Sequence, residues 1–260
     1  MGETLKQEID LTVKEILRSK YVIASTGAGF STESGIADFR GPDGIWTKFG
    51  EPEMDGFQRF TENPKSLIKE FARPGMMGLI KNFLGAKPNP GHHALAELEK
   101  MGILKCLITQ NVDNLHRSAG NKNVIEFHGN VYKLRCLSCN SRFDIVDSNS
   151  IKKHRSTCNG VVKTDAVMFG EPIPPDALQN SFEEAKKCDC IIVAGTSALV
   201  YPAASLPQMA KERGAKIIEI NAEETHLSYV ISDHFLKGKT GEILPIVVDK
   251  IKQLTESGYP

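Results

Sequence analysis

The sequence predicts an α/β fold built around a parallel β-sheet. Short apolar segments that are typical of buried strands alternate along the chain with segments of helical periodicity. Glycine or polar residues follow most of these apolar segments directly, as they do at the ligand-binding edge of an open sheet. The alternation favours parallel strands joined by right-handed helical crossovers. We expect strands that begin at residues 22, 104, 124, 166, 190 and 216.

Several segments carry a helical pattern. Apolar residues recur at helical spacing over residues 5–19, before the first strand. Residues 57–85 predict a small module of two or so short helices, because Pro64 and residues 73–75 interrupt the pattern. Residues 38–46 are too rich in glycine, proline and aspartate for regular structure and predict a mobile loop. Further helices are expected over residues 92–100, 176–186 and 241–254.

The charge balance and the apolar runs exclude several classes of protein. The chain has 260 residues, 32 of them basic and 32 acidic, so its formal net charge is zero. This balance leaves no electrostatic footprint for nucleic acid and no polybasic patch for a membrane surface. The first residues are charged, Lys6 stands where a myristoylation motif requires serine or threonine, and no apolar run reaches the length of a membrane span. We expect a soluble, cytoplasmic protein.

A glycine-rich turn follows the first predicted strand. Gly27 and Gly29 flank Ala28, and next come Ser31 and Thr32, which can open a helix. Glycine lets the backbone approach a pyrophosphate closely, and the N–H groups of a helix N-terminus favour its negative charge. Thr32 stands where the dinucleotide-binding pattern has its third glycine. The turn by itself is therefore consistent both with dinucleotide binding and with a plain strand-to-helix turn.

Polar side chains also follow two later strands. Gln110, Asn111 and Asp113 come after the strand that begins at residue 104, and His128 lies at the end of the strand that begins at residue 124. The carboxyl ends of parallel strands meet at one edge of a sheet, where open α/β sheets bind ligands. A single histidine there is more often structural than catalytic. Beside these polar groups, however, His128 is a candidate general base.

Cysteines at short spacing indicate a metal site after residue 131. Cys136 and Cys139 form a Cys-x-x-Cys pair, and Cys158 follows within a polar stretch, which is typical of a zinc ribbon. A second such pair would have its partner at Arg155, which cannot bind a metal, whereas His154 can. Cys136, Cys139, His154 and Cys158 therefore either hold zinc or form a degenerate ribbon with free thiols. The other cysteines are predicted to be core residues: Cys106, Cys188 and Cys190.

Taken together, these spaced motifs resemble those of one family, the sirtuins, which are NAD-dependent protein lysine deacylases. The resemblance extends from residue 22 to residue 221, with a further fit at residues 238–242. The matching motifs, in family order, are Gly27-Ala28-Gly29 with Ser31, Ser34-Gly35-Ile36, Asp38-Phe39-Arg40-Gly41, Thr109-Gln110-Asn111-Val112-Asp113, Phe127-His128-Gly129, Phe169-Gly170-Glu171, Gly195-Thr196-Ser197, Pro202-Ala203-Ala204 and Ile220-Asn221.

The resemblance implies two domains with the active site between them. A Rossmann-like NAD-binding domain would consist of residues 1–46, 88–132 and 168–260. A helical insertion, residues 47–87, and a zinc-ribbon-like insertion, residues 133–167, would form the small domain. Zinc would have a structural role there, remote from the chemistry.

The resemblance also implies which residues bind the two substrates. The residues implied to bind NAD are Gly27, Ala28, Gly29, Ser31, Thr32, Phe39, Arg40, Gln110, Asn111, Val112, Asp113, His128, Gly195, Thr196, Ser197, Asn221 and Thr240. An acetylated lysine peptide would bind as an added strand, held mainly by main-chain hydrogen bonds. The residues implied to bind it are Val167, Met168, Phe169, Gly170 and Val200.

In the implied reaction, the acyl oxygen attacks the ribose carbon that bears nicotinamide, and nicotinamide leaves. His128 then acts as the general base that activates a ribose hydroxyl, and Asn111 orients the ribose and a water molecule. The products would be deacetylated lysine, nicotinamide and O-acetyl-ADP-ribose. The two alternatives are a protein mono-ADP-ribosyltransferase and a non-catalytic, NAD-sensing interaction module.

The chain departs from the family pattern at a few positions. Ala37 replaces the proline that is commonest at this point of the loop, and Arg155 stands where a second Cys-x-x-Cys pair would have its other cysteine. Residues 57–87 contain no tyrosine, so the Tyr-x-x-Arg motif that pairs with succinyl or malonyl groups is missing. We therefore expect acetyl or longer neutral acyl groups as substrates.

Overall fold

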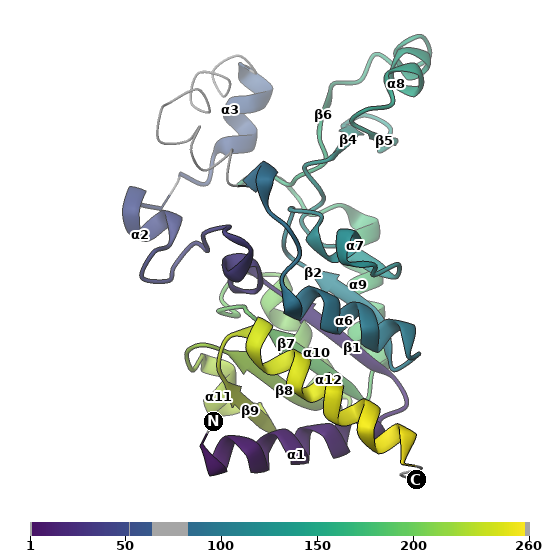
Figure 1. Cartoon of the computed structure of the whole chain (residues 1–260). Coiled ribbons are helices and arrows are strands. Elements are labelled where there is room, and N and C mark those ends of the chain that lie inside the picture. The colour runs from purple at the N-terminus through teal and green to yellow at the C-terminus, as the bar shows by residue number, and fades with distance from the viewer. Residues whose placement is uncertain (1, 52, 64–82, 258–260) are drawn as a thin grey trace.

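The structure, a computed structural model, describes residues 2–51, 53–63 and 83–257 (Figure 1). A sheet of six strands in the order β3-β2-β1-β7-β8-β9 forms its centre. Every neighbouring pair in this sheet is parallel, as the sequence predicts. The strands are β1 (Val22–Thr26), β2 (Leu104–Thr109), β3 (Val124–Glu126), β7 (Cys190–Ala194), β8 (Lys216–Asn221) and β9 (His234–Lys237).

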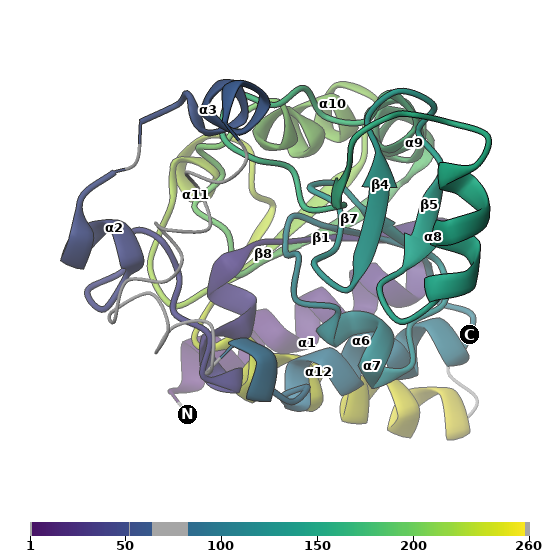
Figure 2. The same ribbon diagram turned by 90° about the horizontal axis from the view of Figure 1, so that it is seen from above.

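Helices cover both faces of this sheet (Figure 2). Those on one face are α1 (Glu3–Arg18), α6 (Pro90–Lys100) and α12 (Thr240–Glu256). Those on the other face are α9 (Pro175–Lys187), α10 (Leu206–Glu212) and α11 (His226–Val230). Among the described residues, no helix is both long enough and apolar enough to cross a membrane.

Each face of the sheet has its own apolar core, and β1 contributes to both. Val22 and Ala24 pack in the core beneath α1, whereas Ile23 packs in the core beneath α10. Successive side chains of a strand point to opposite faces, so a strand covered on both sides needs apolar residues throughout. Helix α1 buries Ile9, Val13 and Ile16 at helical spacing. Burial of each such side chain stabilises the fold by about 1.5–3 kcal/mol.

The strand order reverses direction at β1, which positions the ligand-binding edge. β1 pairs with β2 on one side and with β7 on the other. Thr26 lies opposite Thr109 in β2 and opposite Ala194 in β7, so the carboxyl ends of these three strands are level. The polar and glycine residues that follow them therefore meet at one edge, at the switch point where open α/β sheets bind ligands.

A second, smaller sheet lies at one end of the molecule, beside the carboxyl ends of the large sheet (Figure 1). It is antiparallel, with the order β5-β4-β6. Its strands are β4 (Lys133–Cys136), β5 (Arg142–Asp144) and β6 (Val162–Thr164), and α8 (Ser148–Arg155) connects β5 to β6. The remaining elements are the 3-10 helices η1 (Ala28–Ser34) and η2 (Ala203–Ser205) and the short helices α2 (Ile45–Phe49), α3 (Gly56–Glu62) and α7 (Leu115–Ala119).

The structure differs from the sequence predictions in several places. The strand predicted from residue 166 is wrong: residues 166–171 form an irregular loop with a turn at residues 169–170, because the Met168 N–H donates to the Glu171 side chain and Gly170 has φ +78°. The helix expected to open at Ser31 and Thr32 is a 3-10 helix that begins earlier, at Ala28. Helix α3 ends before Pro64, and residues 83–85 are helical as predicted; the part of the predicted helical module at residues 64–82 lies outside the described residues. β9, α7 and α11 were not predicted.

Candidate active site

The glycine turn is packed tightly against the turn that follows β7. A Cβ on Gly27 would lie 2.7 Å from the Cβ of Thr196, and a Cβ on Gly29 would lie 2.9 Å from the carbonyl oxygen of Gly195. Gly195 has φ +61°, and a Cβ there would lie 2.3 Å from the Phe30 nitrogen. The two turns can approach this closely only because three of the residues lack side chains. The glycines thus let the backbones of the two turns pack directly against each other at the sheet edge.

A hydrogen-bonded cluster links this turn to the residues that follow β2. Asn111 donates from Nδ2 to the Gly27 carbonyl oxygen and to the Ser31 hydroxyl, both at 3.0 Å. The Ser31 hydroxyl in turn donates to Asp113 Oδ2 at 2.6 Å. Burial raises the pKa of Asp113, and hydrogen bonds from Ser31 and the Leu115 N–H act in the opposite direction. The structure therefore brings Asn111 and Asp113 to the segment that contains the glycine turn and Ser31, which lies more than eighty residues earlier in the sequence.

His128 lies beside this cluster with one ring nitrogen already engaged. Its Nδ1 is 3.0 Å from the main-chain carbonyl oxygen of Gln110. A carbonyl oxygen only accepts, so Nδ1 carries the proton and the neutral ring has its lone pair at Nε2. Burial lowers the pKa of His128, and the hydrogen bond to Gln110 opposes that effect. The ring is thus held as the neutral tautomer that can accept a proton at Nε2.

Thr196 lies at the centre of a second group of predicted residues. Its carbonyl oxygen accepts from Asn221 Nδ2 at 2.8 Å, and its hydroxyl lies 3.4 Å from Gln110 Nε2. Ser197 follows in the same turn. Thr240, at the start of α12, is buried, and its hydroxyl has no hydrogen-bond partner among the described residues.

The loop after η1 is organised by Trp46. Phe39 packs against Trp46 with ring centroids 5.1 Å apart, and the Arg40 guanidinium lies 4.2 Å from the Trp46 ring centroid. Arg40 Nε also lies 3.8 Å from Glu51 Oε1. Phe39 and Arg40 therefore both contact the Trp46 ring. The side chain of Arg40 has Trp46 and Glu51 as its partners, and neither belongs to the glycine turn. Thr32 lines a cavity of about 370 Å³ between η1 and this loop.

The segment predicted to bind the peptide touches three parts of the chain. The Val167 N–H donates to the His128 carbonyl oxygen at 2.8 Å, and the Phe57 N–H donates to the Phe169 carbonyl oxygen at 2.9 Å. Trp46 packs against Phe169 with ring centroids 5.8 Å apart. Val200 lies in the loop between β7 and η2, where its carbonyl oxygen accepts from the Ala204 N–H.

A sequence model of the Sir2 family matches residues 27–202, which contain the glycine turn, Asn111, His128 and the segment at 167–170. The chain belongs to the Sir2 family.

Known Sir2 proteins are similar to it over nearly their whole length. A protein of Pyrococcus furiosus named NAD-dependent protein deacylase is 46% identical over 250 residues, covering 94% of this chain and 98% of that protein. A crystal structure of a Sir2 homologue in complex with NAD has a TM-score of 0.78 and 42% identity and covers 94% of each chain. A Sir2 variant bound to a deacetylated p53 peptide and 3′-O-acetyl ADP-ribose has a TM-score of 0.75 and 33% identity, covering 96% of this chain and 98% of that one.

The small sheet of this Sir2 protein gathers the four predicted metal ligands. One ligand atom from each of Cys136, Cys139, His154 and Cys158 lies within 4.8 Å of all the others. The Sγ atoms of Cys136 and Cys158 are 3.8 Å apart, and Cys139 Sγ is 4.0 Å from His154 Nε2. Tetrahedral zinc with Zn–S bonds of about 2.3 Å separates two sulfur ligands by about 3.8 Å. Three thiols and one imidazole at these distances fit zinc.

Sequence reasoning gave no role to two residues that organise this Sir2 site. Trp46 is the only tryptophan of the chain and follows the Asp38-Phe39-Arg40-Gly41 motif. This position beside a motif could have indicated its role. Glu171 ends the Phe169-Gly170-Glu171 motif, and its carboxylate accepts a hydrogen bond from the Met168 N–H at 2.9 Å. The sequence does not reveal this role, because the charged partners of Glu171 come from two other strands, Arg135 in β4 and Lys163 in β6.

Proposed function

We propose that this chain is an NAD-dependent protein lysine deacetylase that yields deacetylated lysine, nicotinamide and O-acetyl-ADP-ribose. The observation that carries the proposal is the arrangement of His128. Its Nδ1 is fixed by the carbonyl oxygen of Gln110, which leaves Nε2 as the acceptor. Gln110 directly precedes Asn111, whose side chain is bonded to the glycine turn and to Ser31. The names of similar Sir2 proteins support the same activity.

The residues at the sheet edge suit NAD as the second substrate. The turn at Gly27 and Gly29 offers backbone without side chains, which suits a pyrophosphate. The unpartnered hydroxyl of Thr240 and the amide of Asn221 offer hydrogen-bonding groups for the adenosine part. Bound NAD would supply the ribose carbon that the acyl oxygen attacks, with nicotinamide as the leaving group.

We assign His128 and Asn111 different roles. His128 accepts a proton at Nε2 from a ribose hydroxyl, which makes that hydroxyl a better nucleophile. Asn111 cannot change its protonation state, so it orients the ribose and a water molecule through hydrogen bonds. Asp113 is held by Ser31 and the Leu115 N–H, and it fixes Ser31 and Asn111 in turn.

The acetylated lysine peptide is proposed to bind as an added strand between Val167–Gly170 and the loop that contains Val200. Such a mode reads the peptide main chain rather than its side chains. The absence of a tyrosine from residues 57–87 supports neutral acyl groups, because no Tyr-x-x-Arg pair is available there for a carboxylated acyl group.

Zinc is proposed as a structural ion held by Cys136, Cys139, His154 and Cys158. The set joins the Cys-x-x-Cys turn after β4 to the last turn of α8 and to the approach to β6. A sheet of three short strands has too little apolar core to be stable alone, and a bound metal would supply the missing stability.

The test is incubation of the purified protein with NAD and an acetyl-lysine peptide. We expect nicotinamide and deacetylated peptide to form in equal amounts, and neither to form without NAD. A matched succinyl-lysine peptide should react much more slowly than the acetyl peptide. Deacetylation without NAD, or none at all, would contradict the proposal, and transfer of label from NAD to protein without deacetylation would favour ADP-ribosyl transfer instead.

A further inference from the structure

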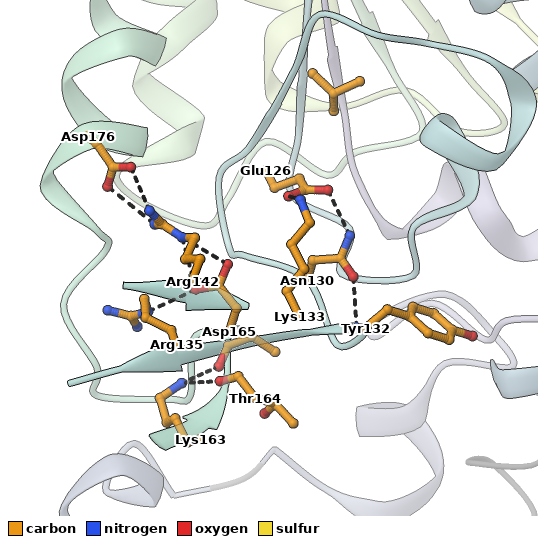
Figure 3. Close-up of polar contacts among 12 residues, drawn as sticks. Glu126, Asn130, Tyr132, Lys133, Arg135, Arg142, Lys163, Thr164, Asp165 and Asp176 are labelled. Carbon is orange, nitrogen blue, oxygen red and sulfur yellow. Dashed lines mark hydrogen bonds and ion pairs between the residues drawn. The ribbon is translucent and has the colours of Figure 1, made fainter. Parts of the chain in front are cut away.

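Four buried, oppositely charged side chains connect the small sheet to the segment at residues 166–171. Arg135 Nε lies 2.9 Å from Asp165 Oδ1, and Lys163 Nζ lies 3.0 Å from Glu171 Oε2. The Arg135 guanidinium also forms an ion pair with the Glu171 carboxylate. Figure 3 shows Arg135 and Lys163 on neighbouring strands, with Asp165 next to them. We call Arg135, Lys163, Asp165 and Glu171 the ribbon charge cluster.

The ribbon charge cluster contributes little net stability to the fold, because burying its charges has a large desolvation penalty. Its side chains are only 2–9% exposed. Removing charges from water costs several kcal/mol per ion, and well-packed apolar residues in place of a buried ion pair often leave stability unchanged or improve it. Burial lowers the pKa of Lys163, while the Glu171 carboxylate acts in the opposite direction. A positional role therefore accounts for the cluster better than stability does.

The cluster is directed at the main chain of the proposed peptide-binding segment. Glu171 Oε2 accepts a hydrogen bond from the Met168 N–H at 2.9 Å, and the Glu171 N–H donates to the Met168 carbonyl oxygen at 3.0 Å. Lys163 Nζ donates to the Ala166 carbonyl oxygen at 2.6 Å. The main chain on both sides of Val167 is thus bonded to charged side chains of the cluster.

The same segment is held against the candidate general base. The Val167 N–H donates to the His128 carbonyl oxygen, and a Cβ on Gly129 would lie only 2.1 Å from the Asp165 carbonyl oxygen. With these groups engaged, the Val167 carbonyl oxygen and the Phe169 N–H have no hydrogen-bond partner within the described part of the chain. Both groups can therefore bond to the main chain of an added strand.

We propose that Glu171 is a positioning residue for the acetylated peptide. Its carboxylate, fixed by Lys163 and Arg135, holds the Met168 N–H and thereby presents the Val167 carbonyl oxygen and the Phe169 N–H to the peptide main chain. This inference rests on the proposed deacetylase function and names the part of the chain that sets its affinity for peptide. It leaves NAD affinity independent of Glu171.

The test compares two double variants that differ only at residue 171. Both carry Lys163→Met, so that no unpaired lysine is left buried. Glu171→Gln keeps an oxygen that can accept from the Met168 N–H, whereas Glu171→Leu removes it. We expect the peptide KM of the Leu variant to be about tenfold higher than that of the Gln variant, because the loss of one hydrogen bond changes an affinity by about this factor. The KM for NAD should stay the same in both.

A second measurement reports on the segment without any reaction. Hydrogen exchange at the Met168 amide should be faster in the Leu variant than in the Gln variant, and both should retain the same folded state by circular dichroism. Asp176→Asn is the control, because Asp176 pairs with Arg142, which also pairs with Asp165, whereas no hydrogen bond or ion pair joins Asp176 to residues 166–171 within the described part of the chain.

The outcomes separate this inference from the proposed function. Equal Met168 exchange in the two variants would overturn the inference even if deacetylation is intact. Faster exchange with an unchanged peptide KM, or an equal rise in the KM for both substrates, would overturn it as well. A wild-type protein that does not deacetylate refutes the proposed function itself, and the peptide-positioning role falls with it.

Discussion

The main-chain carbonyl of His128 accepts a hydrogen bond from the Val167 N–H, with 2.8 Å between the oxygen and the nitrogen. The side chain of the same residue lies 3.0 Å from the Gln110 carbonyl oxygen through Nδ1. One residue therefore joins the candidate peptide-binding segment to the residues that follow β2. Because its main chain and its ring have separate partners, the ring can be removed without breaking the bond to Val167.

Replacement of His128 by alanine should abolish most of the activity. His128→Ala keeps the carbonyl bond to Val167 but removes the proton acceptor, and loss of a general base typically lowers the rate by about a hundredfold to ten-thousandfold. The measurement is kcat for NAD-dependent deacetylation, with NAD binding followed separately by calorimetry. His93→Ala, at an exposed position of α6, is the control and should behave as wild type. Undiminished kcat in His128→Ala would remove His128 from the mechanism.

The pH profile should reflect the environment of His128. Burial lowers the pKa of its imidazole below the ordinary value of about 6.5, and only the neutral ring can accept a proton. The value of kcat/KM should therefore be constant near neutral pH and fall as the pH drops through a midpoint below about 6.5. Measurement of kcat/KM across this range gives the midpoint. A midpoint well above the ordinary value would mean that another group titrates.

Metal content should depend on His154 and not on its neighbour. Wild-type protein should contain about one zinc per chain, and His154→Ala should lose most of it, because the site would keep only three ligands. Arg155→Ala, one residue along the same helix, should keep the metal. His154→Cys should keep it as well, since a thiolate is an equally suitable zinc ligand. Elemental analysis after dialysis measures each variant, and zinc retained by His154→Ala would show that residue not to be a ligand.

A methyl group at Gly27 should weaken the contact between the β1 and β7 turns. Gly27→Ala would place a Cβ 2.7 Å from the Cβ of Thr196, so one of the two turns must move. We expect the free energy of unfolding to fall by about 1–3 kcal/mol, as is usual for an overpacked site. Gly85→Ala, where no atom of the described residues lies within 4 Å of the added Cβ, should change it little. Urea unfolding of the two variants makes the comparison, and equal effects would contradict the packing argument.

The strands were predictable because both faces of the sheet are covered. β1, β7 and most of β2 and β8 are buried on both sides, so they appear in the sequence as short uninterrupted apolar runs. Residues 166–169 have a similar composition, yet they form an irregular loop and no strand. Their hydrogen bonds go to Glu171, Lys163 and His128 rather than to a neighbouring strand, and composition does not contain that information.

The candidate site was predictable as a set of residue types but not as an arrangement. The glycine turn, Asn111, Asp113 and His128 each follow a recognisable strand. Their hydrogen bonds, the tautomer of His128 and the aromatic contacts of Trp46 depend on which strands become neighbours. The same holds for His154. Its spacing from the cysteines permitted zinc ligation, but only the position of α8 in the fold brings its Nε2 close to Cys139.

The sequence by itself determined the parallel α/β fold, the membership of the Sir2 family through its spaced motifs, and the chemical groups available at the strand ends. These features depend on local periodicity and on residue identity, which the linear chain contains. Only the tertiary structure decided that Gly27, Gly195 and Thr196 pack together and that the ribbon charge cluster holds the main chain beside His128. Both depend on contacts between segments far apart in sequence, which form only after the sheet has ordered its strands.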